Sequence, residues 1–318
     1  MRRILGLGLV AAGLVLAAGT VGATTIAVES FNLTPGDLNG QSGGLGSTGW
    51  AGAWTAGTAY ENVVSLQAPA ATPLSYSASG WTLNGGNPAL QIAGGLDSTQ
   101  LAYRSLTANQ SGDVWVSFMM RWNAGAVDQN DALLLWFDNT AAGDHSLVPN
   151  IGFKGNEGDS GPGGVKEDFV VRLIMGANDD YAGNITVPDP AATHLVVGHL
   201  VRGATKYNVF EMWVDPNATN LVGDASANHF VYAVDNTGNT GLTSFNTIGL
   251  RSANLDSNDV ILIDELRLGT TMLDVLNYGS GGLPPVVTEA TIPEPVTMAG
   301  LFLGLTGLGG YIRKRRAA

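Results

Sequence analysis

Residues 113–122 read DVWVSFMMRW, and their side chains alternate along the chain with a period of two. One face carries Val114, Val116, Phe118, Met120 and Trp122, and the other carries Ser117 and Arg121. A two-residue period with one apolar face is typical of a half-buried β-strand. This stretch therefore sets the expectation of a sheet with an apolar core on one side.

The rest of the chain between the two termini repeats this signal. Residues 132–137 form a continuous apolar run, as expected of a central strand. Other strand candidates are residues 169–175, 194–202, 207–214, 229–234, 245–250 and 260–268. Clusters of Gly, Asn, Asp, Ser and Thr separate them and have turn chemistry, while residues 271–276 suggest one or two helical turns. No repeat of fixed period interrupts the series, so we predict one all-β sandwich or barrel over residues 24–278.

Two segments resemble a known family. Residues 31–54, FNLTPGDLNGQSGGLGSTGWAGAW, and residues 260–275, VILIDELRLGTTMLDV, look like the start and end of concanavalin A-like (laminin G-like) jelly rolls. In that family the first and last strands lie together in one sheet, so the resemblance implies that residues 26–31 pair with residues 260–268. The family includes lectins, glycoside hydrolases and adhesion modules, and the fold alone leaves the function open.

The first 23 residues have the features of a secretory leader. Met1-Arg2-Arg3 is a short basic segment, residues 4–18 are apolar, and Val21-Gly22-Ala23 offers small residues to a signal peptidase. We expect cleavage after Ala23 and export of the body of the chain. An uncleaved anchor is the alternative, and it also places the body outside the cytoplasm.

Residues 292–318 combine a polar motif, an apolar span and a basic cluster. Pro293-Glu294-Pro295 precedes the uncharged residues 296–312, which Arg313, Lys314, Arg315 and Arg316 follow. Seventeen residues make a helix of about 25 Å, at the short end of a membrane span. The basic cluster would stay in the cytoplasm and stop transfer. Residues 279–291, with Pro284-Pro285, form a linker between domain and anchor.

This order of parts closely resembles the PEP-CTERM sorting signal of Gram-negative bacteria. The resemblance implies that an exosortase, a membrane-embedded protease, recognises Pro293, Glu294 and Pro295 and processes the tail. It also implies export across the inner membrane to the cell envelope, surface or extracellular matrix, and an association with exopolysaccharide.

Charge and composition exclude some classes of function. All 27 acidic residues lie between Glu29 and Glu294, whereas six of the 15 basic residues lie in the two termini. Residues 24–294 thus carry nine basic residues and a net charge of −18. Such a negatively charged surface repels nucleic acid and anionic lipid, and it attracts divalent cations. The sequence contains no cysteine, so neither a disulfide nor a thiolate metal site can form.

Catalytic signatures are weak. Glycosidases of the jelly-roll family use acids on one strand in a Glu-x-Asp-x-Glu pattern, and the nearest string, residues 157–161, lacks the third acid. Asp264 and Glu265 are adjacent, so on a regular strand they would point to opposite faces. Residues 158–162, GDSGP, resemble a serine-protease nucleophile loop only over five positions. We expect no enzyme, with a glycan-active hydrolase using an unrecognised carboxylate pair as the alternative.

Metal binding rests on two acidic turns. Asp128, Asn130 and Asp131, or Asp256, Asn258 and Asp259, would supply oxygen ligands to calcium, although solvated turns are the alternative. The four histidines, His145, His194, His199 and His229, lack metal-ligand spacing, and His194 and His199 should lie on opposite faces of a strand.

Sugars stack on exposed aromatic rings, and seven tryptophans supply candidates: Trp50, Trp54, Trp81, Trp115, Trp122, Trp136 and Trp213. Core packing is the default for each of them. The sequence therefore predicts an exported, membrane-sorted, lectin-like protein that binds polysaccharide, with no nucleic-acid partner. A cleft with two carboxylates about 5–10 Å apart would favour the hydrolase, and an open concave sheet bearing aromatic side chains would favour binding.

Overall fold

The structure, a computed structural model, describes residues 24–31, 33–34, 36–42, 46–56, 65–66, 73–78, 81–85, 89–93, 100–122, 131–139, 148–155, 167–173, 181–186, 191–225, 229–235 and 241–276. The predicted leader, the linker, the Pro293-Glu294-Pro295 motif, the apolar span and the basic cluster lie outside these residues. No helix in the described part of the chain has the length and apolar character needed to cross a membrane.

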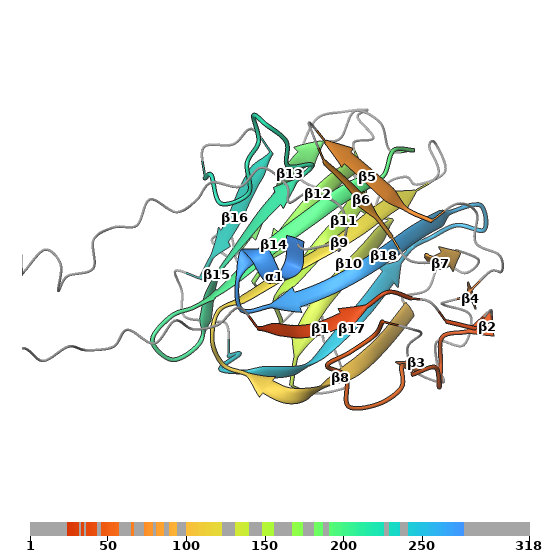
Figure 1. Ribbon diagram of the computed structural model, residues 1–318, viewed down its shortest axis with the longest axis horizontal. Coiled ribbons are helices and arrows are strands. Elements are labelled where there is room, and N and C mark those ends of the chain that lie inside the picture. Colours follow the sequence, from red (N-terminus) through yellow and green to blue (C-terminus); the bar gives the residue numbers. More distant parts are fainter. Residues whose placement is uncertain are drawn as a thin grey trace, which may run out of the picture.

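Two antiparallel sheets make up most of the fold (Figure 1). The first contains, in order, β1 (Thr25–Glu29), β18 (Val260–Gly269), β9 (Val114–Trp122), β14 (His194–Arg202), β15 (Tyr207–Val214) and β16 (Phe230–Val234), and β7 (Leu90–Ala93) also pairs with β18. The second contains β13 (Tyr181–Thr186), β12 (Glu167–Arg172), β11 (Asn150–Gly155), β10 (Ala132–Asp138), β17 (Phe245–Ala253), β8 (Gln100–Gln110) and β3 (Thr55–Ala56).

Two small two-stranded sheets and one short helix complete the described chain. Strands β2 (Gly36–Asp37) and β4 (Ser65–Leu66) pair with each other, as do β5 (Ser75–Ala78) and β6 (Trp81–Asn84). The helix α1 (Met272–Leu276) follows the last strand, where residues 271–276 predicted a helical turn. The described part of the chain is therefore a nearly all-β sandwich, as its alternating segments predict.

The predicted pairing of the two ends of the fold is confirmed. Ala27 lies opposite Leu268 and Glu29 opposite Leu266, in antiparallel register. The face predicted for residues 113–122 is also confirmed, because Val114, Val116, Phe118, Met120 and Trp122 all belong to the core between the sheets. The expectation that this strand is only half-buried is wrong, because Trp115, Ser117 and Met119 on the opposite face are also buried. Ser117 Oγ donates a 2.6 Å hydrogen bond there to the carbonyl of Val275 in α1.

A second apolar layer lies on the outer face of the first sheet. The hairpin β5–β6 and α1 pack there, and both lie in front of the sheet in Figure 1. The residues of this layer include Leu74, Tyr76, Leu83, Trp115, Met119, Leu195, Val197, Trp213 and Leu276. The Tyr76 hydroxyl donates a 2.9 Å hydrogen bond to the carbonyl of Pro216, which ties the hairpin to the segment after β15. Part of the outer face is thus closed to solvent.

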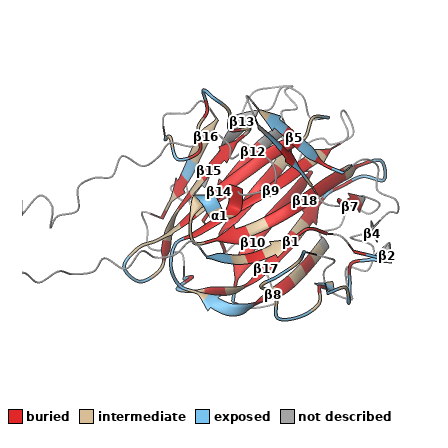
Figure 2. Cartoon of the chain, viewed as in Figure 1, coloured by how far each residue is buried: buried red, intermediate tan, exposed pale blue. Residues whose placement is uncertain are grey.

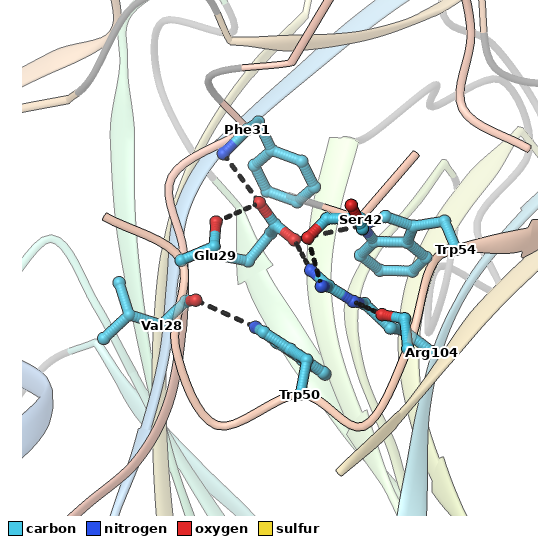
Figure 3. A network of polar contacts seen from close by, with 9 residues as sticks. Val28, Glu29, Phe31, Ser42, Trp50, Trp54 and Arg104 are labelled. Carbon is cyan, nitrogen blue, oxygen red and sulfur yellow. Dashed lines mark hydrogen bonds and ion pairs between the residues drawn. The ribbon is translucent and has the colours of Figure 1, made fainter. Parts of the chain in front are cut away.

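A buried ion pair joins the two sheets (Figure 3). Glu29, in β1, pairs with Arg104, in β8, and their side chains are 0% and 4% exposed. The Glu29 carboxylate also accepts hydrogen bonds from the Phe31 amide (3.1 Å), Ser47 Oγ (2.8 Å) and Trp54 Nε1 (3.1 Å). Burial lowers the pKa of Arg104, and the neighbouring Glu29 carboxylate acts in the opposite direction.

The guanidinium of Arg104 has further partners in the segment after β1. Its Nε donates to the carbonyl of Gly52 and its Nη2 to the carbonyl of Ser42, both at 2.6 Å. The ring of Trp50 lies 5.0 Å from Arg104 Cζ, and Trp50 Nε1 donates a 2.8 Å hydrogen bond to the carbonyl of Val28. The segment that resembles the start of a jelly roll therefore wraps around this ion pair.

Several strands were not predicted. The longest is β8, in which Ala102, Arg104 and Leu106 point inward. Because the middle inward residue is an arginine, the apolar alternation is broken and the periodicity does not identify the strand. In β11 only Ile151 and Phe153 mark the buried face, and two glycines lie among its six residues. Strand β12 begins two residues before the predicted start at residue 169.

Candidate functional site

The outer face of the first sheet is open at its β14–β15–β16 end. The inward residues of β14 and β15 include Val196, Leu200, Phe210 and Met212, so the residues between them face outward. In β16, Ala233 is buried, whereas Tyr232 is 54% exposed. Figure 2 shows the buried centre of the sheet in red, with half-buried and exposed residues along β16.

Four outward residues form a row across this end of the sheet, which we call the outer row: Trp115, His199, Glu211 and Tyr232. His199 lies opposite Trp115 in β9 and opposite Glu211 in β15, and Glu211 lies opposite Tyr232 in β16. Three strand spacings of about 4.8 Å give the row a length of about 14 Å. Antiparallel pairing of four strands, which are separated in sequence, therefore assembles one continuous surface.

Aromatic rings lie along the outer row and along the neighbouring row, which contains Trp213 and Phe230. The His199 and Trp115 rings stack at 4.0 Å with an 8° angle between their planes. Trp115 stacks on Trp213 at 5.7 Å, and Trp213 meets Phe230 at 4.9 Å. Phe230 in turn stacks on Tyr232 at 5.8 Å. Trp115 and Trp213 are buried, and they lie beside the partly exposed rings of His199 and Phe230 on the same face of the sheet.

His199 and Glu211 form a hydrogen-bonded pair at the centre of the row. His199 Nδ1 and Glu211 Oε2 are 2.8 Å apart, and the two side chains are 16% and 28% exposed. Within the described part of the chain, neither His199 Nε2 nor Glu211 Oε1 makes a further hydrogen bond. The carboxylate holds the imidazole in place, which leaves one polar atom of each side chain for a ligand.

A second, apolar row runs beside the outer row. Val201 lies opposite Val209, Val209 lies opposite Val234, and all three are half-buried. The open end of the sheet thus combines a carboxylate, an imidazole, an exposed phenol ring and a strip of valines. This combination matches a ligand with both hydroxyl groups and apolar C–H faces, because carboxylates accept strong hydrogen bonds from hydroxyls and aromatic rings present flat apolar surfaces.

The other tryptophans lie elsewhere. Trp54, Trp122 and Trp136 are almost fully buried, which matches the default expectation of core packing. Trp50 is partly buried beside Arg104. Trp81 lies in β6, but its side chain is outside the described part. Among the candidates whose side chains the structure describes, Trp115 and Trp213 alone take part in the outer face.

The expectation that Asp264 and Glu265 point to opposite faces is wrong. The pairing of β18 with β9 shifts between Asp264 and Arg267, and Glu265 has a φ of +52°. Ile263 and Leu266 both point into the core between the sheets, so the two acids between them share the outer face. A β-bulge adds one residue to the strand, and sequence periodicity alone does not reveal it.

Neither of these acids is open to a substrate. Asp264 is fully buried against Gly85 of the β5–β6 hairpin, and Glu265 is 6% exposed and pairs with Arg267 at 2.8 Å. Burial, and then the neighbouring Glu265 carboxylate, raise the pKa of Asp264 to about 8. Asp264 is therefore a protonated, covered acid at neutral pH.

Of the two acidic turns, the structure describes the one at Asp256, Asn258 and Asp259 completely. Asp128, Asn130, His145 and residues 157–162 lie outside the described residues. The buried Asp259 carboxylate accepts the amide of Asp256, and the Asp259 amide donates to the Asp256 carbonyl at 3.0 Å, so these groups brace their own turn. Across the described ranges, no three acidic or histidine side chains cluster as metal ligands would.

The predicted orientation of His194 and His199 is confirmed. The His194 ring packs against Trp122 and Phe169 on the core side of β14, and its Nδ1 lies 2.7 Å from Asp215 Oδ2. His199 stacks on Trp115 on the outer side. Glu211 and Tyr232 were not identified from the sequence, because their proximity depends on the register of β15 with β14 and β16.

No family model matches the chain, and no curated protein matches it. Among solved structures, it is similar to the globular domain of calreticulin from T. cruzi, with 11% identity, 80% of this chain and 91% of that chain covered, and a TM-score of 0.45. A carbohydrate esterase from the Shiga toxin-encoding bacteriophage phi24B gives 9% identity, coverage of 78% and 99%, and a TM-score of 0.42.

Peanut lectin with a bound 9mer peptide gives 12% identity, coverage of 64% and 95%, and a TM-score of 0.38. At these levels of similarity the likeness says nothing about the ligand of this chain. The sandwich is therefore defined by its own strand pairings, and the candidate site by the residues that those pairings bring together.

Proposed function

We propose that this protein is a non-enzymatic, lectin-like module of the concanavalin A-like type that binds polysaccharide at the outer row. The observation that carries the proposal is the His199–Glu211 pair, whose remaining polar atoms lie between the buried Trp115 ring and the exposed Tyr232 ring. Glu211 Oε1 would accept a sugar hydroxyl, and His199 Nε2 would bond to a second one. The ring of Tyr232 would stack on the apolar face of the same or the next sugar.

The location of the protein belongs to the same proposal. The leader would direct export, and Pro293-Glu294-Pro295 would present an extended segment to an exosortase-type protease, since each proline restricts its own φ and disfavours helix in the preceding residue. Residues 296–312 and the Arg313–Arg316 cluster would hold the tail in the membrane until processing. The binding module would then act at the cell surface or in the extracellular matrix, where exopolysaccharide is its partner.

A glycan array, probed with the exported protein with and without calcium, tests the binding. We expect retention of oligosaccharides by the wild type and loss of signal for Glu211→Gln. Asn246→Ala, a change of a half-buried polar residue in β17 of the other sheet, is the matched control and should keep the signal. An array that stays blank under both conditions would contradict the proposed function.

The hydrolase alternative is tested separately, because Asp264 and Glu265 share one face. Release of reducing ends from any polysaccharide that binds would identify hydrolysis, and Asp264→Asn should abolish it if the pair is catalytic. Since both acids are covered by β5–β6 or paired with Arg267, we expect no release of reducing ends by the wild type.

A further inference from the structure

The first residue of the described fold is bound to the segment that follows its last strand. The backbone nitrogen of Thr24 lies 3.2 Å from Asp274 Oδ2 and 3.2 Å from Thr270 Oγ1. In the opposite direction, the Thr270 amide donates a 3.1 Å hydrogen bond to the carbonyl of Thr24. The start of β1 and the start of α1 are thus held together at one point.

Asp274 Oδ2 is the centre of this contact. Besides Thr24 N it accepts hydrogen bonds from the Thr271 amide (2.8 Å), Thr271 Oγ1 (2.9 Å) and Thr270 Oγ1 (3.3 Å). A Cβ atom at Gly269 would lie 2.2 Å from Asp274 Cβ, so glycine at that position lets the aspartate approach the end of β18. The surrounding chain therefore fixes one carboxylate oxygen opposite the nitrogen of Thr24, which is an exposed residue.

The sequence places the predicted leader cleavage at this same nitrogen. Val21-Gly22-Ala23, which lies outside the described residues, directs cleavage to the bond between Ala23 and Thr24. Hydrolysis of that bond by a signal-peptidase-type endopeptidase consumes one water molecule. The hydroxyl group of the water goes to the new carboxyl group of Ala23, and its hydrogen goes to the nitrogen of Thr24, which takes up a further proton from solvent and becomes an α-ammonium.

We infer that Asp274 is the binding site for the α-ammonium group that leader cleavage creates at Thr24. An ammonium offers three N–H donors and a positive charge, whereas the amide of the precursor offers one donor and no charge. Hydrogen bonds between two ionised groups are shorter and stronger than neutral ones. Processing therefore strengthens the closure of the sandwich at its two ends, and it does so only when cleavage leaves Thr24 first.

The inference rests on the leader and is independent of the proposed glycan binding. N-terminal sequencing of the exported protein should give Thr24 as the first residue. In the chain that begins at Thr24, Asp274→Asn should lower the Tm by about 2–4 °C, the range for a partly exposed ion pair in a domain of this size. In a matched chain that begins at Ala23, the amine is displaced by one residue, and the same substitution should lower the Tm by less.

Acetylation of the α-amino group provides a second measurement that needs no substitution. It removes the charge, and it should lower the Tm of the Thr24 chain and leave that of the Ala23 chain almost unchanged. This comparison decides the question even if Asp274→Asn fails to fold. A first residue other than Thr24, or equal Tm losses in the two chains on acetylation, would overturn the inference.

Discussion

Two hydrogen-bonded pairs of side chains in this protein differ in their burial and in the number of their hydrogen-bond partners. Glu29 and Arg104 lie at the edge where the two sheets meet, are almost completely buried, and are surrounded by hydrogen-bond partners. His199 and Glu211 lie on the outer face of the first sheet, are partly exposed, and hold one hydrogen bond between them. Both pairs also contact a tryptophan ring, Trp50 in the first and Trp115 in the second.

The difference shows that the number of hydrogen bonds a carboxylate already accepts decides whether it can also bind a ligand. The Glu29 carboxylate receives four donors, including Arg104, so no ligand could add a bond without breaking one. Glu211 receives one donor within the described chain, its Oε1 accepts none there, and its side chain is 28% exposed. We therefore infer that the Glu29–Arg104 pair stabilises the fold and that the His199–Glu211 pair binds the ligand.

The largest effect is expected from Arg104→Met. It leaves the Glu29 carboxylate buried without its cation, which typically costs about 3–5 kcal/mol in the free energy of unfolding. Urea unfolding followed by tryptophan fluorescence would measure it. The glycan affinity of the fraction that remains folded should be unchanged. A loss below about 1 kcal/mol would mean that the pair does not tie the sheets together.

Asp264 sharpens the comparison, since it is buried like Glu29 but its Oδ2 has no hydrogen-bond partner among the described residues. Its pKa is about 8 in the folded state, against about 3.9 in an unfolded chain. The folded protein thus keeps a proton that the unfolded chain loses, and stability should fall as pH rises from 4 to 8, by at most about 1.4 kcal/mol per pH unit.

Asp264→Asn, which has the shape of the protonated acid, should remove this pH dependence. The gain in the free energy of unfolding of the variant over the wild type should therefore grow between pH 5 and pH 8, by about 3–4 kcal/mol. Thermal unfolding in buffers of equal ionic strength would show it. Parallel pH profiles for the two proteins would contradict the assignment of a buried, protonated Asp264.

Glu211→Gln should affect binding far more than stability. The His199–Glu211 pair is partly exposed, so its loss should change the free energy of unfolding by at most about 1 kcal/mol. Loss of a charge-assisted hydrogen bond to a sugar hydroxyl should weaken glycan binding about tenfold, which corresponds to about 1.4 kcal/mol. Isothermal titration would measure the glycan affinity, and urea unfolding of the same preparation would measure the free energy of unfolding. A large loss of stability with an unchanged glycan affinity would contradict the assignment of this pair to binding.

Tyr232→Ala should have the smallest effect on stability, because the side chain is 54% exposed. Surface changes of this kind typically stay within about 0.5 kcal/mol. Binding should weaken, since the stacking ring is lost, and Tyr232→Phe should retain most of it because the ring remains. Equal affinities of the alanine and phenylalanine variants would show that the ring does not contact the glycan.

Much of the fold could be predicted because most core strands obey a simple period. β9, β14 and β15 alternate or run apolar over eight or nine residues, and their ends were predicted within one residue. β8 was missed because Arg104 occupies a core position, and its partner Glu29 is 75 residues away in the sequence. A buried charge is invisible to periodicity unless its partner is also known.

The sequence predicted the type of residue in the candidate site, but it did not predict which residues come together. Tryptophans that could serve a sugar site were identified, and Trp115 and Trp213 do lie in or beside the outer row. Glu211 and Tyr232 could not be chosen among similar residues, because cross-strand neighbours are set by register and not by sequence distance. For the same reason, the bulge that brings Asp264 and Glu265 to one face was not foreseen.

The most direct test of the central claim is the glycan affinity of the double variant Glu211→Gln/Tyr232→Ala, measured by isothermal titration against the polysaccharide that the array selects. The outer row predicts a Kd raised at least tenfold, with a Tm within about 2 °C of the wild type. An unchanged Kd in a folded double variant would contradict the claim and place the binding site elsewhere on the molecule.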